Sequence, residues 1–331
     1  MQIINISMRE AGQRLDKFLL RFFSEAPPSF VYKMLRKKNI VLNGKKADGS
    51  EKISENDQLK LFLADETIAK FTKPLAVPQS MPLDIIYEDN DVLLINKPTG
   101  ILSQKADALD VSMNEYLISY LLEDGSLTTA DLATFHPAIC NRLDRNTSGI
   151  ILAGKTMVGL QELSQMLKSR SLDKYYLCLV VGEIDEDASI EGYLQKDKKS
   201  NKVTVMANKG EDASYIKTAY HPLANNGHVT LLEVELITGR THQIRSHLAS
   251  IGHAIVGDAK YGNKKINEQF RNEYGLRHQL LHAWLVCFDS AKDSKLAYLA
   301  GKSFMATLPQ QFNEILKSEH LEEYDEKSNF A

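Results

Sequence analysis

The spacing of apolar residues in the first part of the chain predicts two short helices. One apolar face repeats at the i, i+3, i+4, i+7 interval of a helix, at Leu15, Phe18, Leu19 and Phe22. Pro27 and Pro28 interrupt this pattern, and Ser29 is the expected N-cap of a second helix. The apolar face of that second helix consists of Val31, Met34 and Leu35.

The end of the second helix and a β-hairpin are predicted next. The last turn of the helix is basic, with Arg36, Lys37 and Lys38, which suits the negative end of the helix dipole. Asn39 is expected to end the helix, because Asn tolerates the left-handed conformation of a C-cap. A short strand over Ile40 to Leu42 then precedes Asn43-Gly44, a strong signal for a hairpin turn. An alternating segment from Ile53 to Leu63 predicts the last strand of a compact unit over residues 12–63.

The chain beyond this unit predicts a linker and then a larger domain of strands and helices. Residues 64–82 contain three prolines without clear periodicity and are expected to be the linker. Two strands flank a hairpin turn at Glu88 to Asp91. Helices are expected at Ser112 to Leu122 and Val158 to Ser169, and strands at Tyr175 to Val181, Val229 to Leu236 and Ala283 to Phe288. The domain is expected over residues 83–310, followed by a C-terminal tail over 311–331 that is solvated from Glu319 onward.

Length and composition are those of an ordinary soluble protein. The 331 residues favour two domains, and a hydrophobic content of 43% with 25% charged residues is enough for a packed core. No run approaches the roughly 20 apolar residues of a membrane helix, and the first residues lack the pattern of a secretory signal. The three cysteines are far apart, which disfavours a disulfide framework or a thiolate zinc site. A cytoplasmic protein without membrane contact is expected.

Charge is distributed unevenly along the chain. The net charge is −3, but Met1 to Leu63 contain 12 Lys and Arg against 7 Asp and Glu, whereas Ala64 to Ala331 contain 28 against 36. A small basic module therefore precedes an acidic body, which suggests binding of a polyanion at the N-terminus. Charge alone is equally consistent with a solvated basic face.

The densest polar cluster is Asn141-Arg142-Leu143-Asp144-Arg145-Asn146-Thr147-Ser148-Gly149. It precedes the apolar run Ile150 to Ala153, so we predict a loop that leads into a strand. Asp144 lies between two arginines whose positive charge favours an ionised carboxylate. Such a carboxylate can act as a nucleophile or a base. A surface ion pair with no catalytic role would explain the same residues.

The cluster resembles the H-R-L-D-x-x-T-S-G signature of the RluA-type pseudouridine synthases. Further segments resemble motifs of that family in the same order, namely Asn96–Gly100, Lys174–Tyr176, Gly239–Arg245, Gly257–Gly262 and Leu281–Ala283. In the N-terminal unit, R-L-D-K-F-L, the basic helix and V-L-N-G-K resemble the S-four RNA-binding module of a small-subunit ribosomal protein. The resemblance covers about Gly12 to Phe288, and within the family the chain is RluC/RluD-like.

The resemblance implies roles for individual residues. Asp144 is the implied catalytic aspartate, Tyr176 stacks on the target uracil, and Arg245 pairs with the Asp144 carboxylate. Arg142 contacts RNA near the extruded nucleotide. The N-terminal module is expected to contact phosphates through Arg14, Lys33, Arg36, Lys37 and Lys38. Asp144 has three open roles: attack on the ring, attack on the sugar, or removal of a proton.

These roles agree with the chemistry of the reaction. The enzyme must break the bond between uracil and sugar, rotate the base and rejoin it through C5, so the base has to leave the stack. An aromatic side chain is a sequence-tolerant platform for the detached ring. An arginine offers planar, bidentate contact to a carboxylate.

Two positions depart from the family pattern. The family usually has His where this chain has Asn141, and Asn can form hydrogen bonds but cannot carry a charge. A structural role is therefore expected at this position. Ser103-Gln104 stands where many relatives have His after the K-P-x-G motif.

Two signals for other functions are weaker. Gly149 to Thr156 formally matches a P-loop, but a P-loop needs an apolar strand before its first glycine, and here the apolar run follows it. His278 and His282 are four residues apart, but a strand at this point would form no helical face for a metal. No metal, nucleotide or other cofactor is expected.

The sequence as a whole predicts an α+β protein, with a small N-terminal RNA-binding module and a catalytic domain built on a mixed, largely antiparallel sheet. The expected activity is isomerisation of specific uridines to pseudouridine by a monomer, with large-subunit ribosomal RNA as the expected substrate. The alternatives are a transfer-RNA pseudouridine synthase, a non-catalytic RNA-binding protein of ribosome assembly, and a P-loop hydrolase. The presence of Asp144, Tyr176 and Arg245 together disfavours the non-catalytic alternative, because binding alone does not require them.

Overall fold

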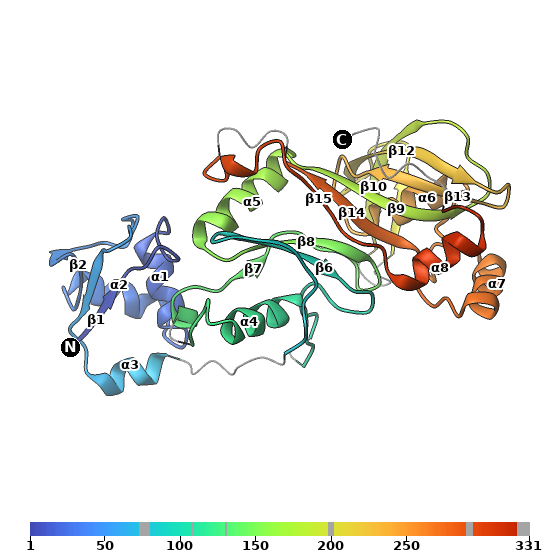
Figure 1. Ribbon diagram of the computed structural model, residues 1–331. Helices are drawn as coiled ribbons and strands as arrows, with labels where there is room; N and C mark the ends of the chain where they lie inside the picture. Colours follow the sequence, from blue (N-terminus) through green and yellow to red (C-terminus); the bar gives the residue numbers. More distant parts are fainter. Residues whose placement is uncertain (73–79, 108, 130, 198–201, 289–293, 323–331) are drawn as a thin grey trace. The chain divides into compact units, whose positions relative to one another are not determined.

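A computed structural model describes residues 1–72, 80–107, 109–129, 131–197, 202–288 and 294–322 (Figure 1). The chain forms two compact units. The first comprises residues 1–94, 104–141 and 152–165, and the second comprises residues 95–103, 142–151 and 166–331. Each unit is therefore assembled from three separate stretches of sequence.

The N-terminal part of the first unit is a four-stranded sheet with two helices. The sheet has the order β1-β4-β2-β3, with β1 (Gln2–Asn5), β2 (Ile40–Leu42), β3 (Lys45–Lys46) and β4 (Gln58–Leu61). The helices are α1 (Leu15–Phe22) and α2 (Pro28–Arg36), and their apolar faces form one core with the sheet. The two predicted helices and the hairpin are confirmed. Asn43 and Gly44 both have positive φ, 50° and 73°, as a two-residue hairpin turn requires.

Three details of the N-terminal prediction are wrong. Helix α2 begins at Pro28 with Pro27 as N-cap, not after Ser29, because a proline in the first turn lacks only an amide that would have no helical acceptor. The left-handed residue after the helix is Lys38, with φ 60°, rather than Asn39, because the helix already ends at Arg36. The last strand is shorter than predicted, because Ile53 bonds to the backbone near Gln13 instead of extending β4.

A helix also occupies part of the predicted linker. Helix α3 (Asp65–Phe71) has two acidic residues in its first turn, which favours helix formation at that end. Ile68 is buried and packs on the core of the N-terminal sheet and helices, so the linker is not irregular throughout. Residues 73–79, with Pro74 and Pro78, lie outside the described residues.

The rest of the first unit contains the predicted hairpin and helices. Strand β5 (Ile85–Glu88) neighbours β6 (Val92–Lys97), as the turn signal predicted. Helix α4 (Met113–Glu123) starts with a capping box between Ser112 and Glu115. Short elements η1 (Asp131–Ala133) and β7 (Ala138–Ile139) follow, and α5 (Met157–Ser169) begins in this unit.

The second unit contains most of the larger sheet. Its strands are the first part of β8 (Ser148–Gly154) together with β9 (Asp173–Val181), β10 (Ala188–Lys196), β11 (Val203–Met206), β12 (Ser214–Asn225), β13 (Val229–Glu235), β14 (Leu281–Cys287) and β15 (Ser303–Met305). The 11-stranded sheet has the order β11-β10-β12-β13-β9-β14-β8-β6-β5, with β15 beside β14 and β7 beside β8. Strand β14 is antiparallel to β9 and parallel to β8. The predicted α+β class with a mixed, largely antiparallel sheet is confirmed.

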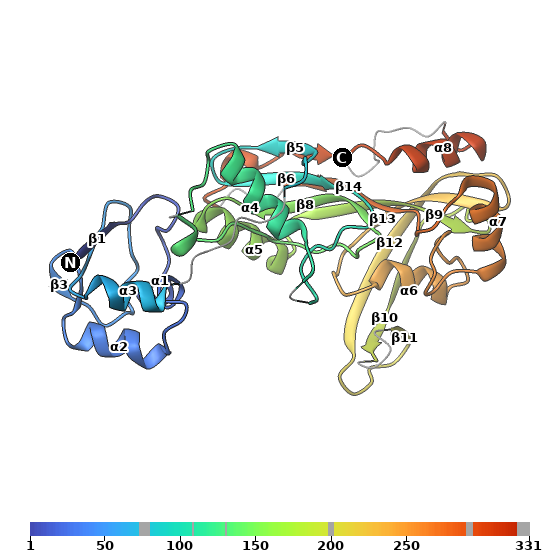
Figure 2. The ribbon, with the colours of Figure 1, turned by 90° about the horizontal axis from the view of Figure 1, so that it is seen from below.

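Helices of the second unit pack on this sheet. They are α6 (Gln243–Ser250), α7 (Lys264–Tyr274) and α8 (Gln310–Ser318), with the short turn η2 (Ala297–Leu299). Figures 1 and 2 both show α7 and α8 beside each other, and their buried side chains share a core cluster with β9. Among the described residues, none of the helices combines the length and the apolar character needed to cross a membrane.

The predicted C-terminal tail is wrong in its first part. Phe312, Ile315 and Leu316 have helical spacing and are buried in the core cluster with Leu179 of β9. The side chain of Glu319 accepts hydrogen bonds from Asn226 and Tyr274, at 2.8 and 2.9 Å, so it is not a free solvated end. Residues 323–331 lie outside the described residues.

The P-loop alternative does not agree with the backbone. Gly149 lies inside β8, and the residues that would have to wrap a phosphate form the extended strand itself. A Cβ on Gly149 would come within 2.1 Å of the Ala283 carbonyl oxygen of β14. Glycine is therefore needed there for close strand packing, not for a phosphate.

Candidate active site

Asp144 lies in the loop before β8, and buried side chains hold this loop from several directions. The Ser103 hydroxyl donates to the Leu143 carbonyl at 2.7 Å and accepts from the Leu143 amide at 2.9 Å. On the other side of Asp144, Gln279 donates to the Thr147 hydroxyl at 3.2 Å, and the Ser148 hydroxyl bonds to Nδ1 of His282 at 2.8 Å. The backbone that carries Asp144 is therefore fixed on both sides.

Lys97 adds a further support to the same loop. Its side chain is fully buried, and Nζ donates to the carbonyls of Pro98, Ile101 and Arg145 at 2.8, 3.0 and 3.0 Å. Three acceptors match the three protons of an ammonium group. Burial lowers the pKa of Lys97 to about 7, and the negative charge of Asp144 opposes this shift. Lys97 thus joins the end of β6 to the residue that follows Asp144.

We expect Lys97→Met to destabilise the protein by about 3 kcal/mol or more, because it leaves three carbonyls without their donor. Lys168→Met is a matched control, since Lys168 is exposed in the last turn of α5. Urea unfolding at neutral pH measures both free energies. Equal stability of the two variants would contradict the proposed support by Lys97.

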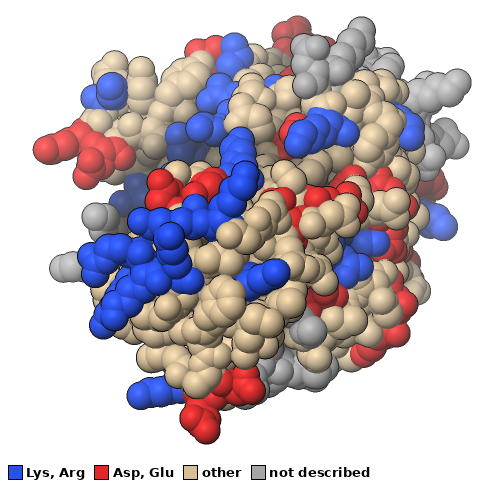
Figure 3. Space-filling model, turned by 90° about the vertical axis from the view of Figure 1, so that its left-hand side faces the viewer, with Lys and Arg blue, Asp and Glu red and all other residues tan. Residues whose placement is uncertain are grey.

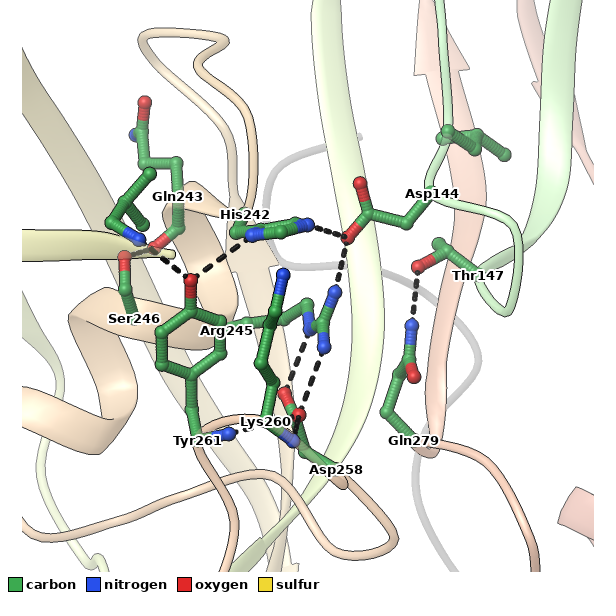
Figure 4. Close-up of polar contacts among 12 residues, drawn as sticks. Asp144, Thr147, His242, Gln243, Arg245, Ser246, Asp258, Lys260, Tyr261 and Gln279 are labelled. Carbon is green, nitrogen blue, oxygen red and sulfur yellow. Dashed lines mark hydrogen bonds and ion pairs between the residues drawn. The ribbon is translucent and has the colours of Figure 1, made fainter. Parts of the chain in front are cut away.

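The Asp144 carboxylate is bound by Arg245 of α6, as the family resemblance implies (Figure 4). Nη1 of Arg245 donates to Oδ2 of Asp144 at 2.7 Å. Asp258 binds the other edge of the guanidinium, and its two oxygens accept from Nε and Nη2 at 2.7 and 2.9 Å. Asp258 is buried, whereas the Asp144 side chain is 25% exposed, so Asp144 is the carboxylate that a ligand can reach.

The charges of this triad support one another. Burial alone would lower the pKa of Arg245, but Asp258 and Asp144 raise it above its ordinary value. Burial alone would raise the pKa of Asp258, but Arg245 and the amides of Lys260 and Tyr261 lower it. The guanidinium is therefore charged at neutral pH, because Asp258 offsets the unfavourable effect of burying its charge.

Tyr176 of β9 and His242 at the start of α6 lie close to the triad. Tyr176 is buried, and burial together with the Asp144 charge raises the pKa of its hydroxyl, so the phenol stays neutral. Nε2 of His242 is 3.8 Å from Oδ2 of Asp144. Burial also lowers the pKa of His242, which keeps the imidazole neutral at neutral pH. The site thus joins an ionic triad to two neutral rings.

This arrangement agrees with the comparison with known proteins. The family described as RNA pseudouridylate synthase matches residues 91–250. The ribosomal large subunit pseudouridine synthase C of Rickettsia bellii is 31% identical over 321 residues, which cover 92% of this chain and 97% of the relative. This chain belongs to the RluA-type RNA pseudouridine synthases.

A further relative and a solved structure agree with this assignment. The RNA pseudouridine synthase YlyB of Bacillus subtilis is 28% identical, over 95% of this chain and 97% of its own length. The solved structure of human RNA Pseudouridylate Synthase Domain Containing 4 has a TM-score of 0.59 at 20% identity, over 73% of this chain and 94% of the human chain. The human structure supports the same fold.

The two departures from the pattern of the RluA-type synthases have structural explanations. Oδ1 of Asn141 accepts the amide of Leu152 at 2.7 Å, which is a contact of the kind that a structural role requires. Ser103 contacts both the amide and the carbonyl of Leu143, directly before Asp144. Neither position needs a titratable group for these contacts.

The structure identifies three site residues to which sequence reasoning gave no role. Asp258, His242 and Lys97 all lie inside motifs of this synthase family, but motif matching does not show which side chains meet. Their signal in the sequence was weak, because each is a single polar residue inside a longer motif. The contacts between distant segments become visible only in the fold.

The basic residues of the N-terminal module form a separate candidate site for RNA. Lys33, Arg36, Lys37 and Lys38 are exposed at the end of α2, and basic side chains gather on this side of the molecule (Figure 3). A groove of about 740 Å³ lies beside them, lined by residues that include Tyr32, Lys33, Arg36 and Lys46. Arg14 differs from the others, because it forms an ion pair with Asp16 at 2.8 Å.

Proposed function

We propose that this RNA pseudouridine synthase isomerises specific uridines in large-subunit ribosomal RNA, with Asp144 as its catalytic group. The observation that carries the proposal is the ion pair of the partly exposed Asp144 with Arg245, which Asp258 holds from behind. A carboxylate on such a support is fixed beside a positive charge before substrate arrives. It can then act on the sugar or the ring of a uridine without reorganising its surroundings.

The neighbouring residues support a reaction on an extruded nucleotide. A base inside a helix cannot rotate, so the target uridine has to leave the stack. Tyr176 supplies an aromatic ring beside Asp144 for the detached uracil. Arg142 is exposed two residues before Asp144 in the same loop, where it can contact the RNA backbone or the space that the base vacates.

The choice of large-subunit ribosomal RNA is supported by the relatives. Those of Haemophilus influenzae and Rickettsia bellii are both named ribosomal large subunit pseudouridine synthase C, and each matches over more than nine-tenths of this chain. An enzyme on such a substrate must bind a folded, highly charged RNA. The exposed basic residues of the N-terminal module are suited to this task.

Pseudouridine mapping tests the substrate directly. Ribosomal and transfer RNA from cells with and without the gene are sequenced after pseudouridine-specific chemical labelling. We expect defined sites in large-subunit ribosomal RNA to be lost without the gene and restored by the wild-type chain. Loss of sites in transfer RNA alone, with ribosomal RNA unchanged, would contradict the proposed substrate.

We further propose that the N-terminal module, over residues 12–63, binds RNA phosphates through Arg14, Lys33, Arg36, Lys37 and Lys38. The last four carry no ion pair within the part of the chain that the structure describes, so their charges are available to phosphate. Arg14 is already paired with Asp16, and its share of the binding should be smaller. Phosphate contacts release bound counterions, which makes the affinity depend on salt.

Replacing Lys33, Arg36, Lys37 and Lys38 by Gln should reduce the salt dependence of RNA affinity. The slope of log Kd against log salt concentration should fall by about 3, at roughly 0.7–0.9 per lost phosphate contact. The control replaces the exposed Lys168, Lys264, Lys265 and Lys317 by Gln, which changes the net charge equally. Filter binding over a salt series measures both slopes. Equal slopes for the two variants would show that the module does not hold phosphates.

A further inference from the structure

His242 has a left-handed backbone conformation. Its φ is 56° and ψ is 19°, in the left-handed region that residues other than glycine rarely adopt. The neighbouring Gln243 fixes this turn, because its buried side chain bonds to Thr238, Thr218 and the Lys217 carbonyl. The chain therefore holds His242 in a costly conformation beside Asp144, which is typical of functional positions.

The hydrogen bonds of Tyr261 favour one of the two neutral tautomers of His242. The Tyr261 hydroxyl accepts the amide of Val203 at 2.9 Å, and its oxygen lies 3.0 Å from Nδ1 of His242. With an amide already donating to it, the hydroxyl uses its own proton toward Nδ1. Nδ1 is then the acceptor, and the neutral ring carries its proton on Nε2.

This Nε2–H group points into the reaction site. Figure 4 shows the ring of His242 directed at the Asp144 carboxylate, from which Nε2 is 3.8 Å away. That separation is longer than a hydrogen bond. Within the described ranges of the chain, Nε2 has no hydrogen-bond acceptor, so the donor is available to a ligand beside Asp144.

We propose that His242 binds the target uracil, with Nε2–H donating to one of its carbonyl oxygens. This inference rests on the proposed function, because it requires the uracil to lie beside Asp144. Breaking the bond between N1 and C1′ leaves its electron pair on the ring, where the carbonyl oxygens share the negative charge. The ring becomes neutral again when C5 bonds to C1′, C5 loses its proton and N1 gains one. A fixed N–H donor stabilises the charged stage more than the starting uridine.

The proposed contact is independent of the first step of catalysis. Attack of Asp144 on the ring would also place negative charge on a carbonyl oxygen. Arg245, Asp258 and Lys260 surround the same region, but Arg245 and Asp258 are committed to each other. His242 is thus the neutral donor in front of Asp144.

The test compares His242→Leu with His242→Gln in the full-length protein. Neither Leu nor Gln is branched at Cβ, but Gln retains an N–H donor close to the position of Nε2. His320→Leu is the control, because His320 is exposed and also has a left-handed backbone, with φ 58°. The substrate is RNA labelled with [5-³H]uridine from cells that lack the gene, and release of tritium is followed in a single turnover.

We expect His242→Leu to lower the single-turnover rate roughly 100-fold, and His242→Gln to retain at least about a tenth of the wild-type rate. RNA affinity and thermal unfolding should match those of the His320→Leu control. Tyr261→Phe is the second variant. It should lower the rate about 10-fold, because the ring of His242 loses the hydroxyl that favours the tautomer with a proton on Nε2.

Two results would overturn the proposal. One is a wild-type rate for His242→Leu. The other is an equal loss for the Leu and Gln variants together with an unchanged rate for Tyr261→Phe. If His242→Leu does not fold, Tyr261→Phe alone decides, and a wild-type rate for it rejects the proposal. A wild-type rate for Asp144→Asn would instead contradict the proposed function itself, so the two failures are distinguishable.

Discussion

Asp144→Asn protein should bind its RNA substrate with nearly wild-type affinity and form no pseudouridine. Asn retains the size of the side chain and one oxygen acceptor but cannot carry the negative charge. Phosphate contacts dominate RNA affinity, and a carboxylate cannot supply them, so binding should change little. Nucleoside analysis of the treated RNA, with filter binding on the same protein, measures the two properties separately.

The stability of this variant should fall only slightly, by about 1 kcal/mol. Arg245 keeps two hydrogen bonds to Asp258, and the Asp144 side chain is partly exposed. Asp212→Asn is a matched control, because Asp212 is exposed and has a positive φ of 59° that Asn tolerates. A large loss of stability or of RNA affinity would mean that the lost activity cannot be assigned to chemistry.

Asp258→Asn should differ from Asp144→Asn, because it should lose much of its stability as well as its activity. The buried guanidinium of Arg245 would lose its bidentate partner, and one amide N–H would face its donors. Removing one member of a buried ion pair costs about 3–5 kcal/mol. Activity should fall roughly 100-fold, because Arg245 would no longer be fixed toward Asp144. Urea unfolding and single-turnover assays measure the two effects.

The stability difference between wild type and Asp258→Asn should depend on pH. The folded-state pKa of Asp258 lies below its ordinary value of 3.8, so its stabilising contribution is present above that value. The contribution is lost as pH falls through the lower folded-state pKa. The difference should therefore be constant near neutral pH and become smaller in acid. A difference that does not change between pH 7 and the acid range would contradict the assigned ion pair.

The positions of the secondary-structure elements were largely predictable from local patterns. Apolar spacing located α1 and α2, helices were predicted where α4 and α5 lie, and Asn43-Gly44 located the hairpin between β2 and β3. The ends of elements were less predictable, because they depend on tertiary contacts. Helix α8 was missed although Phe312, Ile315 and Leu316 have helical spacing, because the acidic residues after it favoured a solvated tail.

The candidate site was predictable in its motifs but not in its geometry. The pair of Asp144 with Arg245 followed from resemblance, and the structure contains it. Asp258 closes the triad across 13 residues of sequence, and Lys97 reaches a loop 48 residues away. No local pattern indicates such contacts, because they depend on how β6, α6 and the loop before β8 come together. The tautomer of His242 likewise depends on Tyr261 and Val203, which are distant in sequence.

The central claim is that the charge of Asp144 performs the isomerisation, and tritium release from C5 of uracil tests it most directly. Purified wild-type and Asp144→Asn proteins are each mixed in excess with [5-³H]uridine-labelled RNA from cells that lack the gene. We expect the wild-type protein to release tritium in a single exponential phase and Asp144→Asn to release none above the background without enzyme. Release by Asp144→Asn at the wild-type rate would show that Asp144 is not the catalytic group.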